Sequence, residues 1–301
     1  MTETRSPELH SAVDMDRRSL RVVLAYNPHA GSFSAARLRG LRKALKHAGH
    51  RVTLYDSLDV SALSEPDQID VVCVIGGDGT VRTVVDQCHA TARDTAFCVY
   101  PAGTINLIAR EAGYPVAVEA FAQRLTDDTA SAQHFLGKID DQVFLCCASV
   151  GPDSAAVSRV TATMKRRFGR LAYVIALLGL IHHWPRQRIT VTIDGESHTA
   201  EAAYICKGRY YAGPWMIDDQ ARLGSDHFRV VLLDRARRRD LLRLALSAII
   251  SPRLADPRWL RLTAADITIA ADSPLPIQAD GDILATTPAT IAIVPEPVQF
   301  L

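Results

Sequence analysis

Three glycine-containing turns in the first third of the chain carry residue types suited to phosphate chemistry. They lie at 27–32 (NPHAGS), 76–80 (GGDGT) and 101–106 (PAGTIN). Glycine reaches positive φ angles and lets backbone N–H groups approach a phosphate closely, and a helix that follows directs its unpaired N–H groups at the same anion. One such turn alone is no more than a tight connection requires. Three of them predict a phosphate site, although none matches the Walker A or the GxGxxG pattern.

Each turn follows an apolar run that is typical of a buried strand. The run Val71–Gly76 is unbroken and largely β-branched, as expected for a strand covered on both faces. Leucines at helical spacing (Leu38, Leu41 and Leu45) follow the first turn. This alternation of strand and helix predicts an open α/β sheet, in which the strand ends bring all three turns to one edge.

After about residue 135 the pattern changes to short alternating apolar runs separated by turn residues such as Asp194-Gly195. This pattern predicts an antiparallel β domain, interrupted by helical stretches at about 154–183 and 235–250. We therefore expect a disordered tail at 1–18, an α/β domain at 19–135 and a β-rich domain at 136–288. A C-terminal strand at 289–301 is expected to return to the first domain.

Composition narrows the class of protein. The chain has 301 residues, 48% of them hydrophobic, and a formal net charge of +1. These values fit about two domains, exclude global disorder and disfavour broad nucleic-acid binding. The longest apolar run, Leu171–Ile181, is too short to span a bilayer, and the N-terminus lacks the apolar segment of a secretory signal. Six cysteines without metal-binding spacing point to a reduced cytoplasm.

The three turns, in this order, resemble the catalytic domain of diacylglycerol-kinase-type lipid kinases, which share their fold and GGDGT with NAD kinases. Two later segments resemble the same family: the basic and apolar stretch at 165–181 (KRRFGRLAYVIALLGLI) and the turn at 278–282 (QADGD). The resemblance covers roughly residues 20–300. It implies an NAD-kinase-like nucleotide domain followed by a lipid-binding domain, and ATP- and Mg²⁺-dependent phosphorylation of a lipid hydroxyl in phospholipid biosynthesis.

The resemblance also implies roles for individual residues. Asp280 would be the general base that accepts the proton of the attacking hydroxyl, with Asp78 as a rival base. Without the resemblance, Asp280-Gly281 is an ordinary hairpin turn and Asp78 a turn carboxylate that binds nearby N–H groups. The residues implied at the nucleotide are Asn27, Gly31, Thr53, Gly76, Gly77, Asp78, Gly79, Thr80, Val81, Arg82, Gly103, Thr104 and Asn106.

Two departures from the family pattern concern carboxylates. Leu107 follows Asn106, where relatives often have Asp, and Asp282 stands where they usually have the longer Glu. A structural magnesium of some bacterial members is also implied, with Leu223, Asp226 and Phe228 as ligands. Because backbone carbonyls leave almost no sequence trace, the alternative of an ordinary loop stays open.

The distribution of charge in the second domain indicates where a lipid substrate would be met. The segment 154–193 contains no acidic residue, and its basic residues flank the apolar run Leu171–Ile181. Such a pattern predicts peripheral contact with an anionic membrane, at the inner face of the cytoplasmic membrane, rather than binding to nucleic acid. The alternative is a core helix with solvated arginines. A lipid substrate is expected, but its identity and a homodimer are left open.

Two other functions remain as alternatives. An NAD kinase would use the same GGDGT turn, but it would not explain NPHAG or the basic apolar stretch. A non-catalytic sensor of lipid or nucleotide would fit the changes at Leu107 and Asp282.

Overall fold

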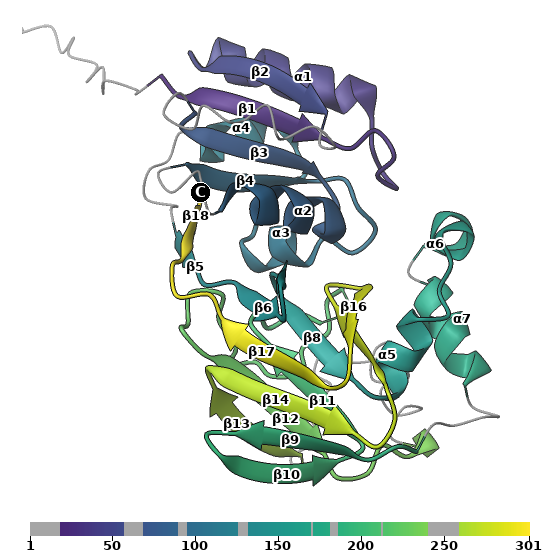
Figure 1. Cartoon of the computed structure of the whole chain (residues 1–301). Coiled ribbons are helices and arrows are strands. Elements are labelled where there is room, and N and C mark those ends of the chain that lie inside the picture. The colour runs from purple at the N-terminus through teal and green to yellow at the C-terminus, as the bar shows by residue number, and fades with distance from the viewer. Residues whose placement is uncertain are drawn as a thin grey trace, which may run out of the picture.

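The computed structural model shows two domains, one above the other in Figure 1. It describes residues 19–56, 69–89, 95–125, 132–169, 171–180, 186–211, 213–239 and 259–301. The expected tail at 1–18 lies outside these residues, as does most of the expected helix at 235–250. The predicted fold class, an α/β domain followed by an antiparallel β domain, is confirmed.

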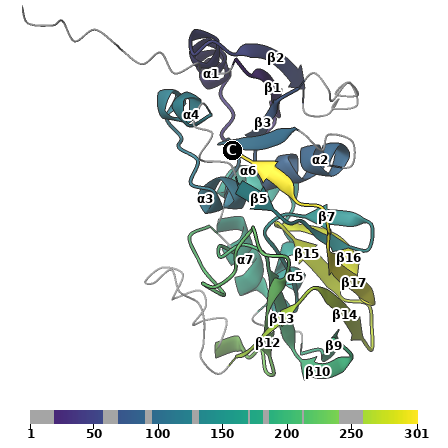
Figure 2. The same cartoon turned by 90° about the vertical axis from the view of Figure 1, so that its left-hand side faces the viewer.

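The first domain is built on a six-stranded sheet of order β2-β1-β3-β4-β18-β5. Strands β1 to β4 and β18 run parallel to one another, whereas β5 closes the edge antiparallel to β18. The helices α1 and α4 pack together on one face of the sheet, and α2 covers the other (Figure 2). The elements are β1 (Arg21–Tyr26), α1 (Ala35–His47), β2 (Arg51–Asp56), β3 (Val71–Gly76), α2 (Asp78–Cys88), β4 (Ala96–Pro101), α3 (Leu107–Glu111), α4 (Val118–Arg124), β5 (Ala132–His134) and β18 (Val298–Phe300).

The sequence pattern explains this packing. All six residues of β3 are buried, because the strand lies in the middle of a sheet with helices on both faces. In α1 the buried residues are Leu38, Leu41 and Leu45, and Ser34 caps the helix by accepting a hydrogen bond from the Arg37 N–H.

The second domain is a sandwich of two antiparallel six-stranded sheets. Their orders are β10-β9-β14-β17-β6-β7 and β13-β12-β11-β8-β15-β16. The apolar faces pack against each other, as in the stacked pair Phe144 and Phe228, whose ring centroids are 5.8 Å apart. The strands are β6 (Gly137–Ile139), β7 (Gln142–Phe144), β8 (Cys147–Val150), β9 (Ile189–Ile193), β10 (Glu196–Ala200), β11 (Ala202–Cys206), β12 (Phe228–Leu233), β13 (Leu260–Ala264), β14 (Asp266–Ala271), β15 (Pro276–Ala279), β16 (Asp282–Thr286) and β17 (Ala289–Ile293).

The strand that returns to the first domain is shorter than the expected segment 289–301. Residues 289–293 form β17, which pairs with β14 and β6, because its alternate residues Ala289 and Ile291 are buried in the sandwich. Only β18 pairs with β4 of the first sheet.

The expected helical stretch at 154–183 is divided into α5 (Pro152–Val157), α6 (Ala162–Phe168) and α7 (Leu171–Gly179). Gly169, at φ +54°, lies in the turn between α6 and α7. The three helices project from the sandwich toward the first domain (Figure 1), and α7 packs on α5 through Ala156, Ala176 and Leu180. No helix in the described part of the chain has both the length and the apolar content of a membrane span.

A buried histidine lies where the two domains meet. His134 in β5 donates its Nε2 proton to the carbonyl of Leu145 at 2.9 Å in the neutral tautomer, and its ring contacts Phe300 of β18. Burial, together with a smaller effect of the nearby Lys207 charge, lowers the pKa of His134 to about 3, against the effect of its hydrogen bond to the Leu145 carbonyl. The histidine is therefore neutral in the folded protein over the physiological range.

This histidine is expected to weaken the fold in acid. The unfolded chain takes up a proton below about pH 6.5, and the folded chain does so only near pH 3, so the stability that neutral His134 contributes is lost as pH falls through this window. The loss is about 2 kcal/mol between pH 7 and pH 5. Urea unfolding at the two pH values measures it. His134→Gln keeps an N–H donor but does not titrate, so its stability should vary less with pH, and equal slopes for both proteins would contradict the assignment.

Candidate active site

The three glycine turns meet in space at the carboxyl ends of β1, β3 and β4. A Cβ atom built on Gly77 would lie 3.0 Å from the Cα of Gly103, and one built on Gly31 would lie 3.2 Å from the Oγ1 of Thr104. The turns therefore approach one another so closely that side chains at these glycines would fill the shared space. The convergence that the sequence predicted is present.

Two asparagines hold the turns in shape. The Nδ2 of Asn27 donates to the Oγ1 of Thr80 at 3.0 Å, and its Oδ1 accepts from the His29 N–H at 2.9 Å. Asn106, at φ +56°, accepts from the Gly103 N–H at 2.8 Å and donates to the Gly103 carbonyl at 3.0 Å. Both amides thus bind protein atoms and shape the backbone that surrounds the site.

Residues of the second domain complete the site. A Cβ on Gly79 would lie 3.2 Å from the Oδ2 of Asp282, which also pairs with Arg82 at 3.5 Å. Gly169, between α6 and α7, lies beside Thr104, where an added Cβ would be 3.7 Å from its methyl group. The site is therefore bounded by the glycine turns on one side and by β16 and the α6–α7 turn on the other.

Asp78 lies at the start of α2, and its carboxylate accepts hydrogen bonds from backbone N–H groups at the start of the neighbouring helix α3. Its Oδ1 accepts from the Ile108 N–H at 3.3 Å, and the N–H groups of Leu107 and Asn106 also contribute. Burial and the negative charge of Asp280 raise the pKa of Asp78 to about 7, against the effect of these N–H groups. Asp78 therefore changes its charge near neutral pH.

Asp280 is buried in the turn between β15 and β16, at φ +50°. Its Oδ2 accepts from the Leu145 N–H at 2.6 Å, and its Oδ1 accepts from the N–H groups of Cys146 and Cys147 at 2.9 and 3.2 Å. Burial raises its pKa, whereas the three N–H groups and Arg82 lower it. Both carboxylate oxygens are thus already committed to the backbone.

A polar network that the sequence did not reveal fixes the Asp280 turn from the other side. Gln278 accepts from the Gly281 N–H at 3.1 Å and donates to the hydroxyl groups of Ser149 and Tyr211 at 2.8 and 3.0 Å. Those two hydroxyls in turn donate to the buried carboxylate of Asp153. Its members come from β8, α5, the loop after β11 and β15, so no local sequence motif marks the network.

The other residues expected at the nucleotide lie in different settings. Val81 lies in α2 with its side chain fully buried in the core, and its N–H donates to the Gly77 carbonyl at 3.0 Å. Thr53 is exposed in the middle of the edge strand β2, opposite Val23, and lies outside the convergence of the turns. Arg82 is mostly buried, and its Nη1 has no hydrogen-bond partner among the described residues. An unpartnered guanidinium nitrogen beside a glycine turn suits an anionic ligand.

Two of the residues expected to hold magnesium, Leu223 and Asp226, have other partners in the structure. The Leu223 carbonyl accepts from the Phe135 N–H at 3.1 Å, and Phe228 begins β12 with its ring in the sandwich core. The carboxylate of Asp226 is 80% exposed and pairs with the ring of His227 at 2.9 Å. Within the described ranges, no group of three or more His, Cys, Asp or Glu side chains is placed to hold a metal ion. Leu107, which stands where relatives of the family often have Asp, is buried in the hydrophobic core of the first domain.

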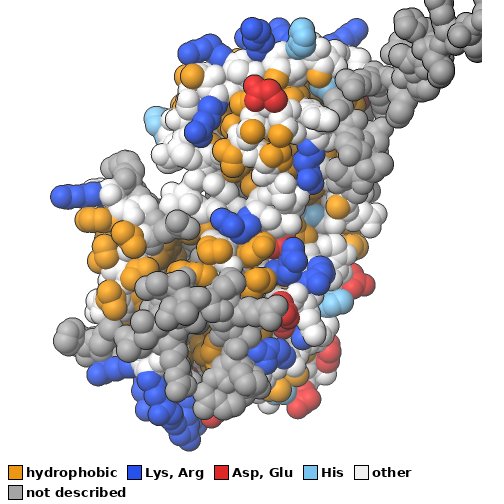
Figure 3. All heavy atoms as spheres, turned by 180° about the vertical axis from the view of Figure 1, so that it is seen from behind, with side chains coloured by type: hydrophobic (Ala, Val, Ile, Leu, Met, Phe, Trp, Pro, Cys, Tyr) orange, Lys and Arg blue, Asp and Glu red, His pale blue; other side chains and the backbone are white. Residues whose placement is uncertain are grey.

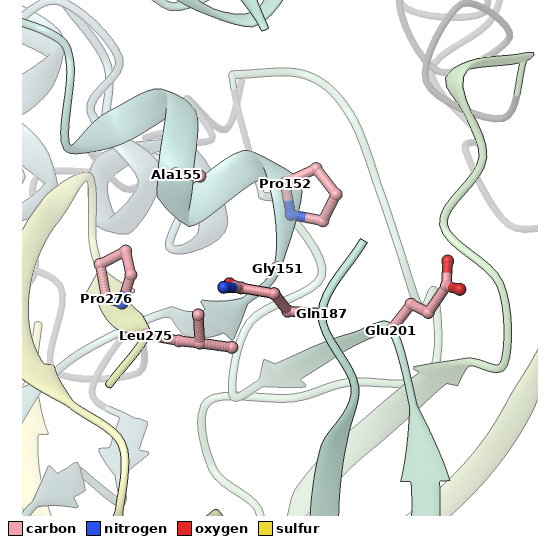
Figure 4. Close-up of a pocket in the computed structure, with 7 residues that line it drawn as sticks. All are labelled: Gly151, Pro152, Ala155, Gln187, Glu201, Leu275 and Pro276. Atoms are coloured by element: carbon pink, nitrogen blue, oxygen red, sulfur yellow. The ribbon is translucent and has the colours of Figure 1, made fainter. Parts of the chain in front are cut away.

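A small pocket in the second domain lies apart from this site (Figure 4). It is lined by residues around the start of α5 and β15, together with Gln187 and Glu201. The carboxylate of Glu201 is already bound by Arg186 at 2.7 Å and by the Ala236 N–H at 2.9 Å. None of the lining residues belongs to the three glycine turns.

Comparison with known proteins agrees with this arrangement. Residues 21–136 match the family model of the diacylglycerol kinase catalytic domain, and residues 147–301 match that of the YegS C-terminal NAD kinase beta sandwich-like domain. A diacylglycerol kinase of Mycobacterium tuberculosis is 28% identical over 97% of this chain and 98% of its own. One from Staphylococcus haemolyticus is 22% identical over 91% and 84%. The crystal structure of a diacylglycerol kinase from Bacillus anthracis superposes with a TM-score of 0.72 at 18% identity, covering 93% of this chain and 96% of that one.

Gly77→Ala should weaken the binding of a nucleoside triphosphate at least about tenfold, since the added methyl group would press against the backbone at Gly103 and push the turns apart. Calorimetric titration measures the affinity. Gly40→Ala is the matched control, because its Cβ would meet only Val118 of α4 at 3.9 Å. Equal affinities for Gly77→Ala and wild type would show that this contact does not shape the nucleotide site.

Proposed function

Since this chain belongs to the diacylglycerol kinase family, whose members are lipid kinases, we propose that it transfers the γ-phosphoryl group of ATP to a hydroxyl group of a membrane lipid. The observation that carries the proposal is the meeting of three glycine turns with a carboxylate of the second domain, Asp282, at Gly79. Phosphoryl transfer needs this combination, because it depends on holding the phosphates and positioning the acceptor hydroxyl.

The nucleotide phosphates are proposed to bind at the start of α2. Gly77 occupies the N-cap position without a side-chain hydrogen bond, so the first N–H groups of the helix have no capping side chain. Unpaired N–H groups and the positive end of the helix dipole attract phosphate. The Arg82 guanidinium, with its unpartnered Nη1 among the described residues, supplies positive charge one turn further along.

The general base is proposed to come from the Asp280–Asp282 turn, where the geometry favours Asp282 over the expected Asp280. Asp280 is buried and binds three backbone N–H groups, so it serves best to hold the turn in place. Asp282 is 41% exposed and faces Gly79 and Arg82, at the edge of the proposed phosphate site. A base must reach the acceptor hydroxyl, and Asp282 has access that Asp280 lacks.

Magnesium is proposed to accompany ATP. Mg²⁺ in kinase sites is usually held by one or two carboxylates together with the phosphates and water. Asp78 is the carboxylate proposed to hold the ion, because burial and the negative charge of Asp280 raise the pKa of Asp78 to about 7, so that added positive charge is favourable there. The ion would neutralise phosphate charge, while the residues of this chain hold and orient the nucleotide.

The lipid is proposed to approach along α7. Leu171, Ile175 and Leu178 are exposed on one face of this helix, while Ala172 and Ala176 face the protein. Phe168 at the end of α6 is also exposed. Figure 3 shows these helices as an apolar lobe bordered by Lys and Arg side chains and separated by a notch from the first domain. An apolar face with a basic border suits an anionic bilayer surface, and the Tyr173 hydroxyl donates to the Gly281 carbonyl at 3.4 Å, which connects the helix to the base turn.

Acceptor and product are best identified directly. Incubation with labelled ATP and a total lipid extract, with NAD as a separate acceptor, should label a lipid and leave NAD unlabelled. Labelled NADP would identify an NAD kinase instead, and ATP binding without any labelled product would identify a sensor.

Asp282→Asn should lower lipid phosphorylation at least about a hundredfold and leave ATP affinity within about threefold, because a base acts in the transition state and adds little to nucleotide binding. Initial rates and calorimetric ATP titration measure the two effects. Asp282→Glu should retain part of the activity, and Asp234→Asn, an exposed carboxylate outside the site, serves as the matched control.

Asp280→Asn separates the two possible bases. It should lower activity and the melting temperature together, because it removes an acceptor from the three N–H groups. A stable but inactive Asp280→Asn protein, with an active Asp282→Asn protein, would restore Asp280 as the base.

Replacing Leu171, Ile175 and Leu178 together by Gln should weaken binding to anionic vesicles by on the order of a hundredfold, since each side chain would lose roughly 1 kcal/mol of apolar burial in the lipid. Vesicle co-sedimentation measures this, and activity on a short-chain, water-soluble lipid should be unchanged. Leu260→Gln, an exposed leucine on β13, is the control. Equal sedimentation of the triple variant and wild type would exclude α7 as the lipid-facing surface.

A further inference from the structure

A lysine in the second domain is completely buried, which is uncommon for a charged side chain. Lys207 follows β11 and is 0% exposed. A buried ammonium is retained only where hydrogen-bond acceptors replace the water that it has lost. Its surroundings therefore indicate what the charge does.

The Lys207 ammonium is bound by the loop at 222–228. It donates to the carbonyl of Ser225 and, at 3.5 Å, to the carbonyl of Arg222. The ring of Phe135 lies on another side, with its centroid 5.8 Å from Nζ. Burial lowers the pKa of Lys207 to about 8, while the charge of Asp226 raises it, so the ammonium form prevails at neutral pH.

This is the loop in which the sequence suggested a structural magnesium ion, and its residues do not suit one. The Leu223 carbonyl is already an acceptor for the Phe135 N–H, and the Asp226 carboxylate points into solvent toward His227. A divalent ion would have to share the loop with the ammonium group, and two buried cations would repel each other. The loop thus already contains one positive charge, supplied by a side chain.

We propose that the ammonium group of Lys207 is the built-in cation of the loop at 222–228, and that this loop takes its folded shape without a metal ion. Two carbonyl groups of the loop, those of Arg222 and Ser225, are turned toward a lysine, which provides charge and donors but cannot dissociate.

The consequence reaches the candidate active site. The backbone N–H groups of Lys207 and Gly208 both donate to the carbonyl of Cys146, at 2.8 and 2.9 Å. The N–H of the same Cys146 donates to Asp280. The backbone of the lysine that binds the loop is therefore hydrogen-bonded to Cys146, the same residue whose N–H holds the Asp280–Asp282 turn.

The first test uses the unaltered protein without nucleotide. We expect its apparent melting temperature to be the same, within about 1 °C, in EDTA and in millimolar MgCl₂ or CaCl₂. Elemental analysis after gel filtration should find no divalent ion at the level of one per chain. A melting temperature that falls in EDTA, together with a retained ion that is lost in Asp226→Asn, would overturn the proposal.

The second test removes the charge and keeps the length of the side chain. Lys207→Met should lower the apparent melting temperature by about 5 °C, because the carbonyls of Arg222 and Ser225 lose their donor. Lys138→Met is the control, since Lys138 is 44% exposed and pairs with the exposed Asp141. Equal melting of Lys207→Met and wild type would contradict the proposal, and if that variant does not fold, the metal measurement on wild type decides alone.

Discussion

The candidate active site depends on the hydrogen bonds that three consecutive backbone N–H groups donate to the carboxylate of Asp280. They join the β15–β16 turn to the segment between β7 and β8, which also receives His134 of the first domain and borders Lys207. Because the carboxylate is buried and lies in a left-handed turn, its position leaves little freedom to the residues that follow. Gly281 and Asp282 are thereby directed at the glycine turns of the other domain, and the candidate active site exists only where these two parts meet.

The burial that fixes this turn also has a cost in stability, because it brings carboxylates together away from water. Asp78 and Asp280 lie close enough for the charge of one to raise the pKa of the other, and both are removed from water. For Asp78 the folded pKa of about 7 exceeds the unfolded value, so its contribution to stability is present at low pH and is lost as pH rises toward 7. The fold thus retains a repulsive pair of carboxylates at neutral pH, an arrangement that active sites commonly show and that structural cores avoid.

The sequence predicted the fold class and the meeting of the glycine turns, because both depend on local signals. Apolar periodicity marks the strands, and glycine marks the places where backbones approach, as Gly77 and Gly103 do. It did not predict the surroundings of Asp280 or Lys207, since both side chains are bound mainly by backbone groups, and a backbone group has no residue type to recognise. Thr53 is the opposite case: its residue type matched a family pattern only loosely, and strand register places it in the middle of β2, opposite Val23, rather than at a strand end.

The position of β18 has a mechanical consequence. The chain leaves the first domain after β5 and comes back into it at β18, so two strands of polypeptide cross between the domains, and the N–H of Val294 binds the carbonyl of Leu136 where they pass. Two crossings that are bound to each other hold the second domain beside the first more firmly than a single connection would. The facing of Asp282 and Gly79, which belong to different domains, is thus secured by covalent connections as well as by the pair that Asp282 forms with Arg82.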